Sequence, residues 1–128
     1  MKRDTENTIP SESTEQKRLF AWMESAAPDH PELLLAFHIP NGGTRQAREA
    51  HNLRLQGVRR GVPDIFLPVP RGDFHGLFVE MKRQRGGVVS EHQKAWIRSL
   101  RAMGYRAEVC KGFEAARDVI IDYLERGT

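Results

Sequence analysis

Asp64, Glu80 and Lys82 have side-chain types and a spacing that together could cleave phosphodiester bonds. A Mg²⁺ ion prefers oxygen ligands and typically binds one or two carboxylates together with water and phosphate. Such an ion lowers the pKa of a bound water, polarises the phosphoryl group and offsets charge on the leaving oxygen. A neighbouring lysine adds a positive charge that can orient the attacking water or stabilise the developing charge. The three residues therefore predict metal-dependent hydrolysis of phosphodiester bonds.

This pattern is weak as text, because an aspartate followed sixteen residues later by Glu-x-Lys arises by chance in many chains. The alternative is a surface Glu–Lys pair on an exposed strand, with the aspartate in a turn. Residues 62–69 and 74–82 are typical of two strands, and 71–73 of a turn, so they predict an antiparallel hairpin. Strand side chains alternate between faces, so Glu80 and Lys82 share one face. A carboxylate on each strand can then converge on one ion.

A helix predicted near the N-terminus adds further candidates. Glu12 and Gln16 are four residues apart and continue into Leu19 and Met23, so they share a face with apolar residues. A polar side chain on that face needs a partner, which a metal or substrate would supply. Glu15 also lines up with Leu19, so periodicity does not separate the two glutamates. The alternative is that both complement the dipole of the first helical turn.

Several other polar residues have two interpretations each. Gln93 could contact the site, or it could complete a capping box with Ser90. Asn41, followed by two glycines, could bring backbone amides to a phosphate or form a simple turn. The histidines lack the spacing of zinc ligands, and Cys110 is expected to be buried and inert.

The net charge of +3 and the pI of about 9.4 are modestly basic. Arginines crowd the segment before Asp64 and the segment after Glu80. This distribution suggests a polyanion brought to a metal site, although charge alone fits a solvated helix face equally well. The predicted DNA-binding residues are Arg45, Arg48, Arg59, Arg60, Arg83, Arg85 and Asn41.

The elements that must position these residues follow from hydrophobic periodicity and stop signals. A first helix should begin at Ser11 or at Ser13, which has capping-box spacing with Gln16. The expected order is helix–strand–helix–strand–strand–helix–strand–helix, which predicts an α/β fold with a central mixed sheet flanked by helices. The remaining elements are expected as strand 33–39, helix 44–56, strands 62–69 and 74–82, helix 90–103, strand 105–110 and helix 113–124.

Length and composition set the limits of this interpretation. The 128 residues predict one domain over 11–128, after a flexible lead-in at 1–10. A single cysteine excludes a disulfide framework and a cysteine-rich zinc site within one chain. The sequence shows no membrane-length apolar run and no signal peptide, so we expect a cytoplasmic protein without a membrane partner.

Longer stretches of the chain carry a family resemblance. They are ESTEQ (12–16), IPNGG (39–43), GVRRGVPDIFLP (57–68), GLFVEMK (76–82) and SEHQ (90–93), followed by Trp96 and Gly104-Tyr105. With these stretches the chain resembles the VRR-Nuc domain nucleases, a branch of the PD-(D/E)XK superfamily. It is most similar to the short stand-alone, phage-associated members.

The resemblance implies a restriction-endonuclease-like core. It also implies that Asp64 and Glu80 bind Mg²⁺ or Mn²⁺ and that Lys82 completes the triad. The helical glutamate of the family falls most naturally on Glu12, a third metal ligand, with Gln16 one turn later and Glu15 as the alternative. Gln93 matches a polar position after the triad. Stand-alone members are associated with homodimers that resolve four-way DNA junctions, also called Holliday junctions.

The leading hypothesis is therefore a structure-selective endodeoxyribonuclease in the cytoplasm of a bacterial or phage-infected host cell. A homodimer fits that task, because symmetric junction cutting needs two active sites. A non-cleaving DNA-binding module is the alternative from another class. Different nuclease substrates also remain open: nicking, restriction-type cleavage or RNA. A restriction enzyme needs base-reading elements, for which 128 residues leave little chain.

Overall fold

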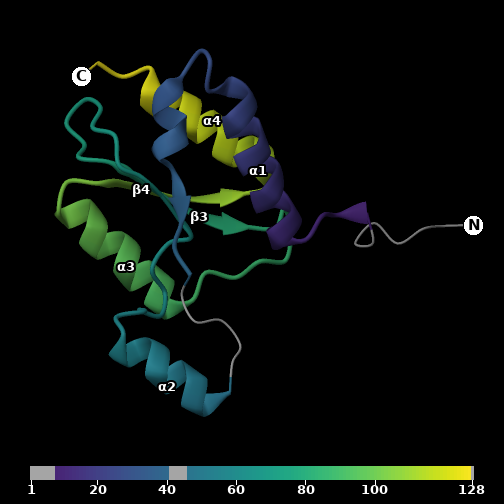
Figure 1. Cartoon of the computed structure of the whole chain (residues 1–128), viewed down its shortest axis with the longest axis vertical. Coiled ribbons are helices and arrows are strands. Elements are labelled where there is room, and N and C mark those ends of the chain that lie inside the picture. Colours follow the sequence, from purple (N-terminus) through teal and green to yellow (C-terminus); the bar gives the residue numbers. More distant parts are fainter. Residues whose placement is uncertain (1–7, 41–45, 128) are drawn as a thin grey trace, which may run out of the picture.

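The computed structural model describes residues 8–40 and 46–127, and its elements form a mixed sheet with helices on both faces (Figure 1). This arrangement confirms the predicted fold class and the predicted order of helices and strands. In chain order the elements are α1 (Glu12–Ala26), the 3₁₀ helix η2 (Pro31–Leu35), β1 (Phe37–His38), α2 (Ala47–Leu55), β2 (Ile65–Leu67), β3 (Leu77–Lys82), α3 (Glu91–Ala102), β4 (Arg106–Lys111) and α4 (Phe113–Leu124).

The sheet has the strand order β1-β2-β3-β4. Strands β1, β2 and β3 are antiparallel neighbours, with Ile65 opposite Val79 in the β2–β3 pair. Strand β4 runs parallel to β3, since α3 provides the crossover between them, and Lys82 is in register with Lys111. Strand β3 is therefore an interior strand, and all six of its residues are buried.

The two faces of β3 pack against different helices. Leu77, Val79 and Met81 belong to the larger apolar core together with buried residues of α1 and α4. Phe78, on the other face, packs in a smaller cluster with Ile97 of α3. Glu80 and Lys82 share this second face because strand side chains alternate. The strand thus presents polar side chains at its end while apolar residues hold it on both sides.

Of the two predicted capping boxes, the structure contains the one at Ser90 and lacks the one at Ser13. The Ser90–Gln93 capping box is present at the start of α3. Helix α1 begins after Ser11, whose hydroxyl oxygen accepts a hydrogen bond from the Thr14 N–H at 3.1 Å. The predicted Ser13–Gln16 capping box is wrong, because the Gln16 amide instead lies 3.1 Å from Nδ1 of His38.

The predicted strand over 33–39 is wrong in its first half. Pro31 begins a 3₁₀ helix, in which the Ala36 N–H bonds to the Leu33 carbonyl, and only Phe37 and His38 pair with β2. The hairpin strands are confirmed but shorter than expected. Met103, the last residue of the predicted helix 90–103, lies beyond the end of α3 and is 69% exposed.

Helix α2 is peripheral, as its polar sequence predicts. It has no buried residue, and Figure 1 shows it standing away from the sheet. It begins after Gln46, whereas Thr44, where the predicted helix 44–56 starts, lies outside the described residues. None of the described helices is long and apolar enough to cross a membrane.

Gly61, three residues before Asp64, adopts a φ of +90° and packs against α3. A Cβ at this position would lie 2.7 Å from His92 Cβ and 2.8 Å from the His92 carbonyl carbon. We expect Gly61→Ala to destabilise the protein by about 2–4 kcal/mol, because it adds a backbone clash to left-handed strain. Chemical denaturation measures this loss.

Gly57→Ala is the matched control for that variant. Gly57 has a φ of +101°, but nothing lies within 4 Å of a Cβ added there. This substitution therefore introduces the strain without the clash, and it should cost only about 1 kcal/mol. Equal destabilisation by the two substitutions would show that the contact between Gly61 and His92 contributes nothing.

Candidate metal centre

Three carboxylates from three separate segments meet at one end of β3. Glu12 lies in the first turn of α1, Asp64 directly precedes β2, and Glu80 belongs to β3. One oxygen atom from each carboxylate lies within 4.8 Å of the others. Asp64 and Glu80 are buried, whereas Glu12 is exposed. The pair from the predicted hairpin and one of the two candidate helical glutamates are thus brought together.

The buried carboxylates are held by specific donors. Oδ2 of Asp64 accepts a hydrogen bond from the Met81 N–H at 2.8 Å. Oε2 of Glu80 accepts one from Nε2 of Gln93 at 2.9 Å and lies 3.5 Å from Nζ of Lys82. Oε1 of Gln93 accepts from the Ser90 N–H at 2.9 Å. The two interpretations of Gln93 are therefore compatible: one amide caps α3 and orients Glu80.

The donor set fits a hard divalent cation. Oε1 of Glu80 is buried and has no hydrogen-bond partner among the described residues. A buried oxygen in this state is costly and calls for an explanation such as an ion. Carboxylate oxygens are the ligands that Mg²⁺ and Mn²⁺ favour, and the cluster contains neither sulfur nor imidazole.

The electrostatics of the cluster agree with this fit. Burial raises the pKa of Glu80 to about 8, with repulsion from Asp64 adding to the shift and Lys82 opposing it. Burial also raises the pKa of Asp64, despite the hydrogen bond from Met81. The pKa of Glu12 is raised as well, because neighbouring groups partly shield its otherwise exposed carboxylate from water and Asp64 repels it. The charged forms of these carboxyl groups are therefore disfavoured, and a bound cation would offset that cost.

Lys82 is part of the same buried environment. It is 7% exposed, and Glu80 is 1% exposed. The alternative of a surface Glu–Lys pair on an exposed strand is therefore wrong. Cys110 is buried on β4, and burial raises the pKa of its thiol to about 12, so it is inert as expected.

Glu15 and Gln16 lie beside the cluster rather than in it. Glu15 is 0% exposed and hydrogen-bonds to Gln84 and to the start of α4. Gln16 contacts Nδ1 of His38, which in turn lies 2.9 Å from the backbone oxygen of Asp64. Gln16 is thus linked to the metal centre through a histidine and a backbone carbonyl.

The predicted DNA-binding arginines do not take part in the carboxylate cluster. No described hydrogen bond or ion pair connects them to the three carboxylates. Arg83 is half-buried, and the other four described arginines are exposed. Arg45 and Asn41 lie outside the described residues. The described arginines are Arg48 on α2, Arg59 and Arg60 before β2, and Arg83 and Arg85 after β3.

Sequence reasoning missed Lys111, a second lysine at the end of the sheet where Lys82 lies. Its position on β4 is in register with Lys82, so both side chains leave the same face of the sheet. The predicted strand ended one residue earlier, at Cys110. Extending its alternation by one residue would have found Lys111.

Comparisons with known sequences and structures point to the same domain family. The sequence profile of the VRR-NUC domain matches residues 2–114. A solved structure described as a "VRR_NUC domain protein" is similar to this chain, with 28% sequence identity and a TM-score of 0.79. The similarity covers 92% of this chain and 91% of that one. No curated protein sequence matches the chain significantly.

Proposed function

Because the chain belongs to the VRR-NUC domain family, which implies a nuclease of the PD-(D/E)XK type, we propose that it is a metal-dependent endodeoxyribonuclease. The observation that carries the proposal is the convergence of Glu12, Asp64 and Glu80 within 4.8 Å beside the buried Lys82. The three carboxylates would hold Mg²⁺ or Mn²⁺.

The reaction is hydrolysis of a phosphodiester. The oxygen of a water attacks phosphorus, the bond from phosphorus to the leaving sugar oxygen breaks, and that oxygen takes up a proton. A bound divalent cation supplies an activated water and offsets negative charge on the phosphate.

The chain's own groups prepare this chemistry. The Met81 N–H and the Gln93 amide fix the orientation of Asp64 and Glu80, as donors around metal ligands commonly do. The Lys82 ammonium is ion-paired with Glu80. We assign it an electrostatic role, orienting the attacking water and stabilising charge on the phosphate.

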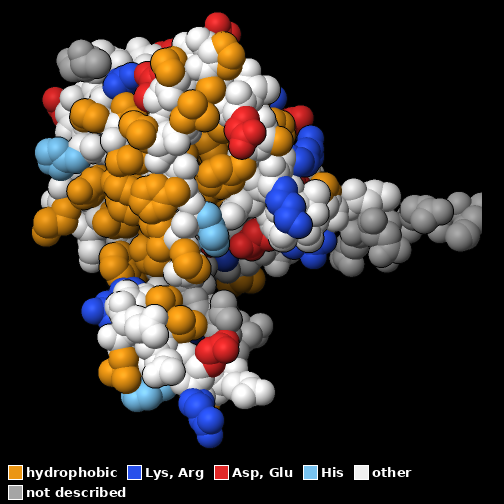
Figure 2. Space-filling model, in the orientation of Figure 1, with side chains coloured by type: hydrophobic (Ala, Val, Ile, Leu, Met, Phe, Trp, Pro, Cys, Tyr) orange, Lys and Arg blue, Asp and Glu red, His pale blue; other side chains and the backbone are white. Residues whose placement is uncertain are grey.

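We further propose branched DNA, such as a four-way junction, as the substrate of a homodimer. The exposed arginines on the segments before β2 and after β3 favour a polyanion, and two linked centres suit paired cuts in a symmetric substrate. Leu34, Leu35 and Phe37 on η2 and β1 are also exposed. Figure 2 shows hydrophobic side chains gathered on one face of the molecule. This exposed apolar face offers a surface that a second copy could cover.

Cleavage of a labelled four-way junction, compared with linear duplex, single strand and RNA, tests the function. We expect paired nicks with Mg²⁺ or Mn²⁺, none with EDTA, none with Asp64→Asn, and a dimeric mass by light scattering. Equal cutting of all substrates would support the proposed nuclease activity but contradict the proposed preference for junctions. Binding without cutting under any metal would replace the proposal with the DNA-binding module.

A further inference from the structure

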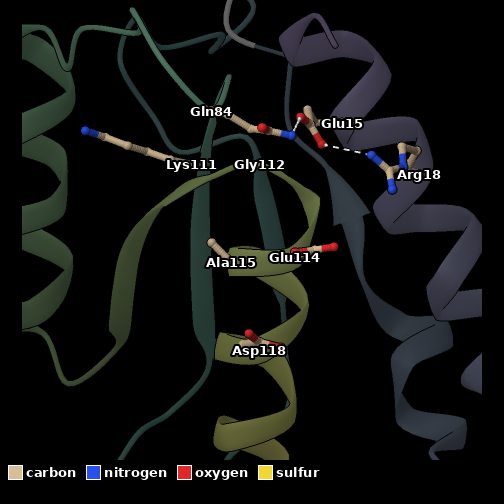
Figure 3. Close-up of a pocket in the computed structure, with 8 residues that line it drawn as sticks. All are labelled: Glu15, Arg18, Gln84, Lys111, Gly112, Glu114, Ala115 and Asp118. Atoms are coloured by element: carbon tan, nitrogen blue, oxygen red, sulfur yellow. Dashed lines mark hydrogen bonds and ion pairs between the residues drawn. The ribbon is translucent and has the colours of Figure 1, made fainter. Parts of the chain in front are cut away.

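Glu15 is a fully buried carboxylate that joins three segments of the chain. Its Oε1 accepts a hydrogen bond from the Phe113 N–H at 2.9 Å, and its Oε2 accepts one from Nε2 of Gln84 at 2.8 Å. Figure 3 shows this carboxylate between Gln84 and Arg18, beside the start of α4. It lines a pocket of about 530 Å³. Helix α1, the chain after β3 and the start of α4 therefore meet at one side chain.

The contact with α4 supplies a cap that the helix lacks. Gly112 is its N-cap residue and has no side chain to accept a first-turn N–H. Glu15 provides that acceptor from another helix, and a carboxylate is favourable at a helix N-terminus. Gly112 leaves room for this arrangement, because a Cβ there would lie 2.9 Å from Gln84 Cγ.

The geometry links this anchor to the metal centre. Glu12 precedes Glu15 by three residues on α1, which is about one helical turn. Among the described residues, no hydrogen bond or ion pair holds the Glu12 carboxylate, so the placement of α1 determines where it lies. Gln84 follows Lys82 by two residues, so the same anchor also restrains the end of the strand that carries Glu80.

We propose that Glu15 is a positioning residue that holds the first turn of α1 in place and so sets Glu12 against Asp64 and Glu80. The inference rests on the proposed function only in taking Glu12 as a metal ligand. It assigns Glu15 no contact with the metal.

Binding of Mn²⁺ to the purified protein without DNA, followed by electron paramagnetic resonance, tests the role of Glu15. We expect Glu15→Ala to raise the Mn²⁺ Kd about 10-fold, as loss of a residue that orients metal ligands commonly does. The metal concentration for half-maximal cleavage should rise in parallel, while the rate at saturating metal changes little. Glu12→Gln should bind Mn²⁺ far more weakly.

Glu15→Gln should remain within about threefold of the wild type, because an amide oxygen can accept the Phe113 N–H and Gln84 can reverse its own amide. Gln84→Ala removes one partner from an exposed position, so it tests the anchor even if Glu15→Ala does not fold. It should raise the Kd in the same direction. Glu114→Gln is the matched control, since Glu114 is exposed, lines the same pocket and carries the same charge.

Two results would overturn the inference. If Glu15→Gln binds Mn²⁺ as weakly as Glu12→Gln, Glu15 is itself a ligand. If Glu15→Ala folds and binds Mn²⁺ like the wild type, the anchor does not position the centre. If Glu15→Ala does not fold, wild-type Mn²⁺ binding by Gln84→Ala leads to the same conclusion. A wild type that binds Mn²⁺ but cuts no nucleic acid would remove the proposed function, whereas the expected series of Kd values would still support the role of Glu15.

Discussion

Lys82→Met is expected to lower the single-turnover rate of DNA cleavage by about 10²–10³-fold, the range typical for loss of one group that stabilises transition-state charge. Its ammonium is 3.5 Å from Glu80 and buried, where a charge acts more strongly than in water. Methionine retains the stem on which Gly87 packs, so the fold should persist. Single-turnover assays at saturating enzyme separate this effect from any change in DNA affinity.

Lys111→Met is the matched control for this prediction. Lys111 is in register with Lys82 on the neighbouring strand, but it is exposed. Its loss removes the same charge from the same face, so a change of less than about threefold is expected for a group outside the reacting centre. Equal losses in the two variants would mean that the rate follows general surface charge. An unchanged rate in Lys82→Met would exclude the lysine from the mechanism.

The fold was predictable where local signals agree with tertiary packing. The bounds of α4 match the prediction, because apolar periodicity over 113–124 coincides with the side that covers the sheet. The segment at 33–39 was not predictable from periodicity, since a short apolar run fits a strand and a 3₁₀ turn equally. Its outcome depends on Pro31 and on the short β2, which pairs with only Phe37 and His38 of this segment.

The candidate centre was likewise predictable from the sequence only in part. The convergence of Asp64 with Glu80 followed from strand alternation within one hairpin. The choice between Glu12 and Glu15 did not, because residues three apart lie on neighbouring positions of one helix surface. The rotation of α1 about its axis decides which of the two glutamates faces the cluster. That rotation is fixed by the contacts of Glu15 with Gln84 and Phe113, which lie 69 and 98 residues away in the sequence.

The second large effect expected is a pH-dependent stability of the metal-free protein. The pKa of Glu80 is about 8 in the folded chain, against 4.5 for an unperturbed glutamate. The folded protein therefore binds more protons than the unfolded chain between these values. The stabilisation is fully present below about pH 4.5 and is lost as the pH rises through 8, with a slope of at most about 1.4 kcal/mol per pH unit.

In EDTA, the Tm of the wild type is expected to fall by roughly 5–10 °C between pH 6 and pH 8. Differential scanning calorimetry measures this fall directly. Adding Mg²⁺ or Mn²⁺ at pH 8.5 should raise the Tm, because the cation binds the folded state and replaces the proton as the partner of the carboxylates. Metal binding and protonation of Glu80 are thus alternative ways of relieving the same repulsion.

Glu80→Gln is the variant that tests this account, because its amide keeps the shape of the side chain and cannot ionise. Its Tm in EDTA should stay nearly flat from pH 6 to pH 8 and should not rise with metal. Other groups titrate alike in both proteins, so the difference isolates Glu80 and its neighbours. Asp122→Asn is the control: its hydrogen bond with Arg106 lowers the pKa of Asp122, so that group titrates below this range. If the Tm of Glu80→Gln falls with pH as steeply as that of the wild type, the pH dependence does not come from Glu80. The charge of the buried carboxylates would then be offset without a cation.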